Sequence, residues 1–149
     1  MDVKQGERVS LISLLTQLSK ALNRRTSEEL LGMRLKPYMA LGYVRDHPGT
    51  TQQELETAML MDANAVVLLL NDLEAARLSV RRRDPDDRRR HLVELTSAGR
   101  NALERADKAR EGLEGEVLAE LTPDERATLR RLVLKVLDSL LAAAPVERA

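Results

Sequence analysis

The sequence SVRRRDPDDRRRHLVELTSAG at residues 79–99 decides the fold of this chain. Two short runs of strand-forming character, 79–83 and 91–95, flank the tetrapeptide DPDD at 84–87. Proline fixes φ and aspartate hydrogen-bonds to its own backbone, so this tetrapeptide favours a turn. Six arginines and three aspartates between positions 81 and 90 leave a net charge of +3. We therefore predict a basic β-hairpin, followed directly by a helix that begins at Thr96.

The length and composition exclude several classes of protein. A chain of 149 residues is long enough for one domain, or two small lobes, with a buried core. It contains no cysteine and only two histidines, which excludes disulfides and thiolate or histidine-rich metal sites. It also lacks a glycine-rich phosphate loop, so we expect no enzyme activity, no cofactor and no metal. Without a signal-like segment or a long apolar run, the chain is expected to be cytoplasmic, with no membrane partner.

Charge is distributed unevenly along the chain, although its sum is zero. Residues 49–76 contain five acidic residues and no lysine or arginine, whereas residues 77–100 contain eight basic and four acidic ones. A local basic patch is sufficient for anion binding whatever the net charge of the whole chain. The hairpin is therefore the expected anion-binding surface.

Helical periodicity and capping sequences predict a mainly α-helical fold with one small β-hairpin. Thr51 with Glu54, and Thr122 with Glu125, are spaced as capping boxes. We expect six helices, at residues 7–25, 35–46, 52–59, 63–76, 96–121 and 123–143. The third and fourth are short and joined by a tight turn, which is the helix-turn-helix pattern. In the fifth, Gly112 and Gly115 favour a kink.

Three segments resemble the MarR (multiple antibiotic resistance regulator) family of bacterial transcription factors. They are HPGTTQQEL at 47–55, DANAVVLLLNDLEAARL at 62–78 and, most specifically, DPDDRRRHLVELTSAGR at 84–100. The resemblance implies a winged helix-turn-helix homodimer that binds double-stranded DNA and acts as a ligand-responsive repressor at a pseudo-palindromic operator. It divides the chain into a first dimerisation region at 1–30, a DNA-binding lobe at 31–95 and further dimerisation helices at 96–149.

Apolar stripes on the first and last helices support a dimer independently. They exceed what a small DNA-binding lobe could cover, and a two-fold dimer would bury them. The candidate dimerisation residues are Leu11, Leu15, Leu132, Val136 and Leu140.

The predicted recognition helix, residues 63–76, departs from the family pattern. Its core-facing positions are Val66, Leu69, Leu70 and Leu73, and its groove-facing positions are Ala63, Asn64, Val67, Leu68 and Asn71. Family members often carry Arg, Ser or Thr at four of these groove-facing positions. Base recognition would therefore use Asn64 on adenine, Val67 on a thymine methyl, and Gln52 or Gln53 from the preceding helix. In the alternative interpretation, the apolar face docks a protein partner and the chain is an interaction module with weak or no sequence-specific DNA binding.

The hairpin arginines are candidates for phosphate and minor-groove contacts, and the alternative is a solvated, self-paired charge cluster. By resemblance, Asp87 and Arg89 form a wing-stabilising pair, which leaves Arg88 and Arg90 to reach DNA. The remaining DNA-binding candidates are Thr51, which also caps its helix, together with Arg77 and Arg82. Arg77 stands where the family usually has a glycine that suits a left-handed helix end.

Both aromatic residues of the chain lie in the second predicted helix. By resemblance, Tyr38, Met39 and Tyr43 would line a pocket for a small aromatic or phenolic effector. The alternative interpretation is ordinary core packing, because a chain without Phe or Trp has few rings with which to build such a pocket.

Overall fold

The computed structural model describes residues 7–26 and 32–143 of the chain. Its elements are α2 (Leu11–Arg25), α4 (Leu35–Asp46), α5 (Gln52–Met59), α6 (Ala63–Ala75), β1 (Ser79–Arg83), β2 (His91–Leu95), α7 (Ser97–Val117) and α8 (Pro123–Ala142). The mainly helical fold with one hairpin is therefore confirmed. The predicted boundary between residues 30 and 31 lies outside the described residues. None of the described helices is long and apolar enough to cross a membrane.

Side-chain caps set the helix starts that the sequence predicted. Thr51 and Thr122 both form complete capping boxes, and the side chains of Asp62 and Thr96 accept N–H groups in the first turns of α6 and α7. The predicted start of the first helix at residue 7 is wrong. Ser10 caps α2 by accepting the N–H of Ser13, so the helix begins at residue 11.

The two strands pair antiparallel with the predicted boundaries, from Ser79 opposite Leu95 to Arg83 opposite His91. The segment before α5 extends this ladder. The N–H of Val93 donates to the carbonyl of Thr50 at 2.9 Å, and Thr51 forms an isolated bridge with Leu92. The hairpin is thereby attached to the start of α5 as well as to the elements before and after it.

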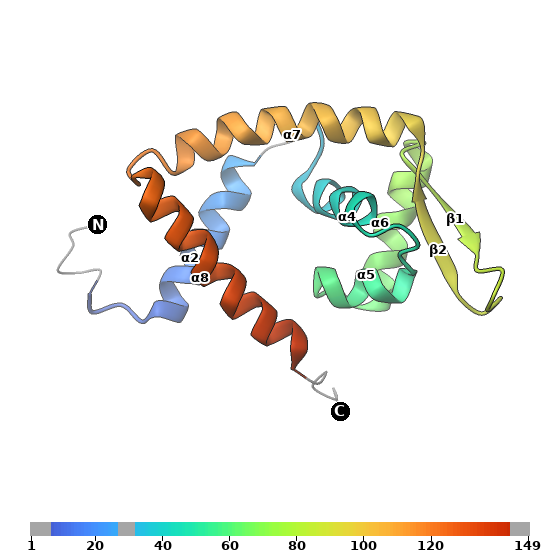
Figure 1. The fold of residues 1–149 in the computed structure, drawn as a ribbon, viewed down its shortest axis with the longest axis horizontal. Helices are drawn as coiled ribbons and strands as arrows, with labels where there is room; N and C mark the ends of the chain where they lie inside the picture. The colour runs from blue at the N-terminus through green and yellow to red at the C-terminus, as the bar shows by residue number, and fades with distance from the viewer. Residues whose placement is uncertain (1–6, 27–31, 144–149) are drawn as a thin grey trace.

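The buried core lies in the lobe formed by α4, α5, α6, β2 and the first half of α7, and Figure 1 shows this lobe with the hairpin projecting from it. Among its most completely buried side chains are Leu41, Leu55, Leu70 and Leu103. All four predicted core-facing positions of the recognition helix, Val66, Leu69, Leu70 and Leu73, are buried in it. The periodicity of α6 was therefore assigned correctly.

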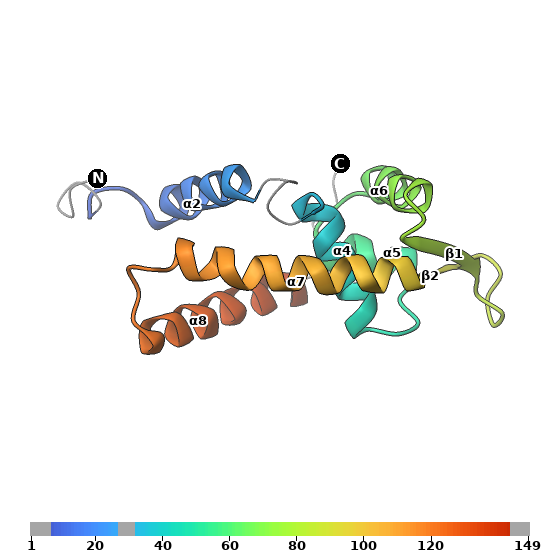
Figure 2. The same cartoon turned by 90° about the horizontal axis from the view of Figure 1, so that it is seen from above.

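Helices α2 and α8 contain no buried residue. Figures 1 and 2 show α7 running from the lobe to the region where α2 and α8 lie. The predicted dimerisation residues all stand exposed on these two helices, and α8 adds further exposed apolar side chains at Leu129, Val133, Leu134 and Leu137. Such an apolar surface on a monomer is typical of an interface.

Helix α7 continues without a break through Gly112 and Gly115, and it ends at Val117 before the predicted residue 121. Its critical glycine is Gly99, in the first turn. A Cβ atom added there would lie 2.0 Å from the carbonyl oxygen of Leu78. Glycine at this position lets α7 start directly against the chain that links α6 to β1.

Replacing Gly99 with Ala is therefore expected to lower the free energy of unfolding by about 3 kcal/mol, because the backbone at Leu78 must move. Gly112→Ala is the matched control in the same helix. No atom lies within 4 Å of a Cβ there, so this variant should gain about 0.5–1 kcal/mol from helix propensity. Urea unfolding of both variants measures the difference, and an equal stability of the two would contradict the close contact.

Candidate nucleic-acid interface

Two aspartates organise the hairpin turn. Asp84 is buried, its Oδ1 accepts the N–H of Asp86 at 2.9 Å, and its Oδ2 lies 3.6 Å from Nε of Arg90. Asp87 accepts the N–H of Arg89 at 3.1 Å and lies 3.4 Å from its Nε. The pairing of Asp87 with Arg89 expected from resemblance is thus present as a contact. Asp84, which sequence reasoning placed in the turn without a pairing role, is the more buried of the two.

The arginines of the hairpin fall into two groups. Four of them are engaged by acidic partners: Arg81 by Glu74, Arg82 by Glu94, Arg89 by Asp87 and Arg90 by Asp84. Within the described residues, Arg83 and Arg88 form no ion pair.

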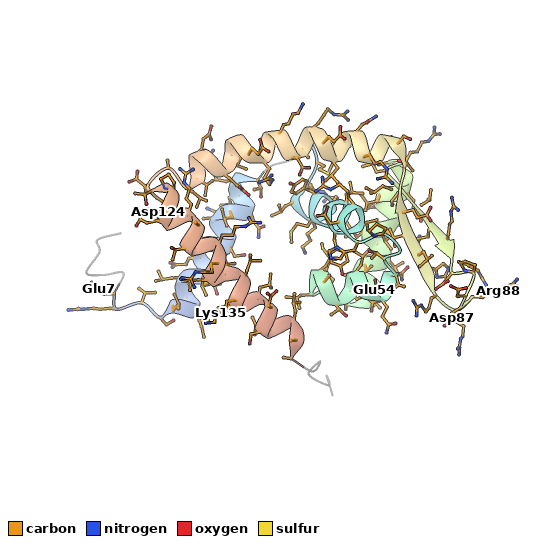
Figure 3. All side chains as sticks on the ribbon, in the orientation of Figure 1. Glu7, Glu54, Asp87, Arg88, Asp124 and Lys135 are labelled. Atoms are coloured by element: carbon orange, nitrogen blue, oxygen red, sulfur yellow. The ribbon has the colours of Figure 1, made fainter. Side chains whose placement is uncertain are left out.

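Figure 3 shows Arg88 beside Asp87 at the tip of the hairpin, the part most distant from the core of the lobe. Arg83 was absent from the predicted DNA-binding residues. The signal that could have found it is its position: Arg83 is the last residue of β1, opposite His91 and next to the turn.

Arg77 adopts a left-handed backbone conformation, with φ of 61°. The N–H of Arg77 donates to the carbonyl of Glu74, and the N–H of Leu78 donates to that of Leu73. This is the Schellman ending that glycine usually provides. The hydroxyl of Thr96 donates to the carbonyl of Arg77 at 2.7 Å, which holds the strained residue in place.

The outer surface of α6 carries the predicted groove-facing residues. Ala63, Asn64, Leu68 and Asn71 are exposed and Val67 is half-buried. Leu68 has 57% of its surface exposed, which is unusual for a large apolar side chain in a helix of this lobe. Nη2 of Arg81 donates to Oδ1 of Asn71 at 2.5 Å, which connects the hairpin to this surface.

A polar cavity of about 230 Å³ joins the start of α5 to the hairpin. It brings together several residues that are far apart in sequence but were predicted to bind DNA: Thr51, Gln52, Gln53, Arg89 and Arg90. Thr51 is buried and its hydroxyl accepts the N–H of Glu54, so its role as a cap is evident in the structure. Gln53 is exposed and Gln52 half-buried.

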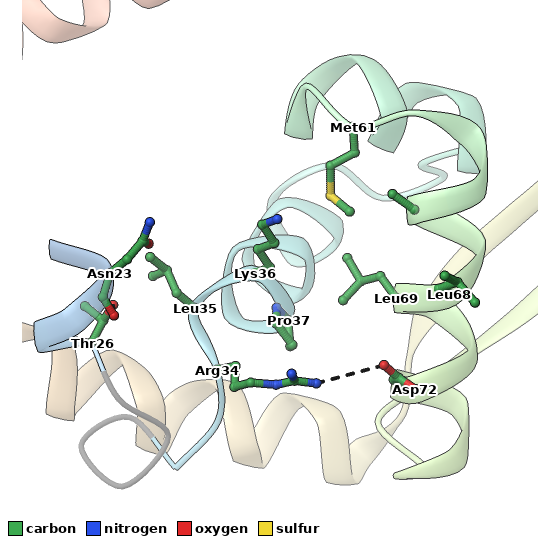
Figure 4. A pocket seen from close by; sticks show the side chains of 11 residues that line it. Asn23, Thr26, Arg34, Leu35, Lys36, Pro37, Met61, Leu68, Leu69 and Asp72 are labelled. Carbon is green, nitrogen blue, oxygen red and sulfur yellow. Dashed lines mark hydrogen bonds and ion pairs between the residues drawn. The ribbon is translucent and has the colours of Figure 1, made fainter. Parts of the chain in front are cut away.

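The predicted effector residues Tyr38, Met39 and Tyr43 line neither the polar cavity nor the larger apolar one described below. Tyr43 stacks on His47 with ring centroids 4.0 Å apart, and Met39 is exposed. A cavity of about 430 Å³ lies instead between α2, the start of α4 and α6. Figure 4 shows its apolar wall of Leu35 and Leu69 and the pair between Arg34 and Asp72 at one side.

Tyr38 belongs to a polar network between α4 and α7. Its hydroxyl donates to Oδ1 of Asp107 at 2.5 Å and accepts from Nε of Arg110 at 2.9 Å, while Nη1 of Arg45 donates to Oδ2 of Asp107 at 2.6 Å. Burial raises the pKa of Tyr38, and the hydrogen bond to Asp107 raises it further. Burial opposes the charge of Asp107, but hydrogen bonds from Tyr38 and Arg45 outweigh it and lower the pKa of Asp107.

Asp107→Asn is expected to lower the free energy of unfolding by about 2 kcal/mol at neutral pH, because hydrogen bonds to a charged group are removed. With its pKa lowered by folding, the Asp107 carboxylate stabilises the protein above the unfolded-state value of about 3.9. That stabilisation is lost as the pH falls through the folded-state value. Urea unfolding across this range should show the two proteins converging in acid.

Asp46→Asn provides the matched control, since Asp46 also contacts Arg45 but is exposed. It should change the free energy of unfolding by less than about 0.5 kcal/mol. A difference between wild type and Asp107→Asn that persists unchanged in acid would contradict the assigned charge state.

Comparison with known proteins shows which family this chain resembles. A model of the MarR family matches residues 31–90. The chain is 34% identical over 99 residues to a Thauera aromatica protein assigned to transcriptional regulation of the hcr operon, a match covering 66% of this chain and 60% of that protein. The chain therefore spans about three fifths of the length of that relative.

Solved structures extend the likeness to most of the chain. A crystal structure of MarR is 25% identical, covers 95% of both chains and superposes with a TM-score of 0.81. A mutant MarR from E. coli complexed with operator DNA is 29% identical, covers 88% of this chain and 96% of its own, and gives a TM-score of 0.77.

Proposed function

This chain belongs to the MarR family of transcriptional regulators, and we propose that it is a repressor that binds a pseudo-palindromic operator as a homodimer. The observation that supports this most strongly is the hairpin. It carries two arginines, Arg83 and Arg88, without ion pairs in the described part of the chain, beside a helix-turn-helix with an exposed outer surface. The likeness to a structure complexed with operator DNA supports the same proposal. A DNA-binding role agrees with the cytoplasmic location expected from the sequence.

In this proposal α6 enters the major groove and the hairpin follows the flanking minor groove. Arg88 at the tip and Arg83 beside the turn would contact phosphates or a narrow minor groove, where arginine is favoured. Arg89, Arg90 and the amides of Gln52 and Gln53 would approach the intervening backbone across the polar cavity. Arg77 adds a positive charge next to the end of α6.

Removing Arg83 and Arg88 together, by Arg83→Ala and Arg88→Ala, should weaken binding to operator and to random duplex by a similar factor. Each phosphate contact contributes about −0.9 to the slope of log K against log salt concentration. The slope should therefore become shallower by about 1.8 when binding is titrated at several salt concentrations.

The matched control is the pair Arg105→Ala and Lys108→Ala, which removes two exposed charges from α7. It should leave the slope unchanged. An unaltered slope in the hairpin variant would overturn the assignment of the wing. A flat salt dependence in the wild type would instead favour the alternative function, an interaction module that docks a protein on Leu68 and its apolar neighbours.

The homodimer is supported by the exposed apolar faces of α2 and α8. Replacing Leu132 and Val136 with Glu should yield monomers, since two charges per subunit would have to be buried without partners in the interface. Sedimentation velocity measures the outcome. Arg130→Glu, at an exposed position on the opposite side of α8, should remain a dimer, and a dimer in the double Glu variant would move the interface elsewhere.

We also propose that a small aromatic or phenolic anion regulates the protein. The cavity between α2, α4 and α6 suits such a ligand better than the surroundings of Tyr38, Met39 and Tyr43. The basic residues Arg34 and Lys36 line this cavity together with apolar side chains. A ligand that binds more tightly to a lobe spacing unsuited to DNA lowers the DNA affinity by that difference. Calorimetry with aromatic acids, using the Arg34→Ala variant as comparison, tests this site.

A further inference from the structure

We propose that α6 recognises thymine through two adjacent side chains, with Leu68 on the 5-methyl group and Asn71 donating a hydrogen bond to O4. This inference rests on the proposed function, because it requires α6 to lie in the major groove. It assigns a base to a helix that has no charged side chain on its outer surface before Asp72. It also gives Arg81 a positioning role.

The exposed side chains of α6 lie along one face of the helix. Asn64, Leu68 and Asn71 are spaced four and three residues apart, so they form one stripe along the helix. All three are exposed, and the buried residues Val66, Leu70 and Leu73 lie on the opposite side. Leu68 therefore occupies the centre of the surface that would face the bases, and an apolar side chain there can contact only apolar groups.

Arg81 fixes the orientation of the Asn71 amide. Its Nη2 donates to Oδ1 of Asn71, while Nε and Nη2 bind the carboxylate of Glu74 at 2.8 and 3.1 Å. Because the guanidinium is also held by Glu74, the Asn71 oxygen is directed toward the hairpin. Its NH₂ group is the part left to interact in the groove.

This orientation changes what Asn71 can read. Asparagine usually recognises adenine by accepting from N6 and donating to N7 at once. With its oxygen directed at Arg81, Asn71 presents the donating half of that pair to the groove. The side-chain amide of Asn64 makes no hydrogen bond to the described residues, so both of its halves remain for adenine.

Thymine matches the combination of a donor and a neighbouring apolar side chain. In the major groove it presents the O4 acceptor and the C5 methyl group side by side. Cytosine presents an N4 donor in place of O4, which would face the Asn71 NH₂ group unfavourably. Guanine and adenine present acceptors at N7 but no methyl group for Leu68.

The test begins with selection of bound duplexes from a random library by the full-length protein. Thymine should be enriched at one or more positions of each half-site. Replacing that thymine with deoxyuridine removes only the methyl group and should weaken binding about fourfold per half-site. Replacing it with 5-methylcytosine keeps the methyl group but inverts the hydrogen bond, and should weaken binding tenfold or more.

Variants assign each contact to its side chain. Leu68→Ala should bind thymine and deoxyuridine operators equally and still reject 5-methylcytosine. Asn71→Ala should still bind the thymine operator more tightly than the deoxyuridine operator, but should no longer reject 5-methylcytosine. Leu68→Ala should leave the unfolding transition unchanged, because Leu68 is exposed, and Asn71→Ala, which removes one exposed hydrogen bond, should shift it only slightly.

Arg81→Met should free the Asn71 amide to rotate, and should therefore reduce the loss of affinity when adenine replaces the thymine. Arg81→Lys should restore part of that loss of affinity. Arg25→Met is the matched control, since Arg25 also pairs with a glutamate, Glu116, but lies on α2 rather than on the hairpin. A purely structural role of Arg81 would weaken binding to all sequences alike. That result would overturn the positioning role.

The outcomes separate the two proposals. If no sequence is enriched, sequence-specific operator binding fails and the recognition of thymine fails with it. If an operator is enriched but tolerates deoxyuridine at every thymine, the operator binding holds and the role of Leu68 is overturned. If it discriminates against deoxyuridine and Leu68→Ala abolishes the discrimination, the inference stands.

Discussion

The structure depends on one junction, at which the end of α6, the base of the hairpin and the start of α7 meet within a few ångströms. Thr96 connects them: its hydroxyl donates to the carbonyl of Arg77, accepts the N–H of Gly99, and its own N–H donates to the carbonyl of Leu78. Gly99 permits this approach because a side chain at its position would overlap the Leu78 carbonyl. The direction of the hairpin and that of α7 are consequently set by the same few atoms. The left-handed conformation of Arg77 is a cost of that geometry, compensated by these hydrogen bonds.

Local chemistry made most of the fold predictable. Both strands, the capping boxes at Thr51 and Thr122 and the bounds of α4 follow from turn, cap and proline preferences that act over a few residues. The start of α2 was missed because Ser10 carries a weaker signal than a capping box. The end of α7 was missed because no side-chain signal marks residue 117.

The partners of charged side chains could not be predicted in the same way. A run of six arginines and three aspartates permits many pairings, and the choice among them is made by folding. Asp84 is buried by the turn, Glu94 faces Arg82 across the ladder, and Glu74 approaches Arg81 from α6. Tyr38 likewise donates a hydrogen bond to Asp107 on α7, which lies 69 positions away in the chain. The interpretation of the hairpin as a self-paired cluster therefore describes four of its arginines, Arg81, Arg82, Arg89 and Arg90. DNA contact by the hairpin stays a prediction.

The internal pairings also determine how the lobe can move. Tyr38, Arg45 and Arg110 connect α4 to α7 through Asp107, and the Thr96 junction connects α6 and the hairpin to the same helix. The lobe is thus attached to α7 at two places along the axis of that helix, which resists rotation of one against the other. A change in the spacing between two recognition helices would then arise where α7 meets α2 and α8, whose described residues are all at least partly exposed. Leu68 and Leu69 of α6 also line the cavity that reaches Asn23 of α2. A molecule bound there would therefore contact both α2 and the recognition helix α6.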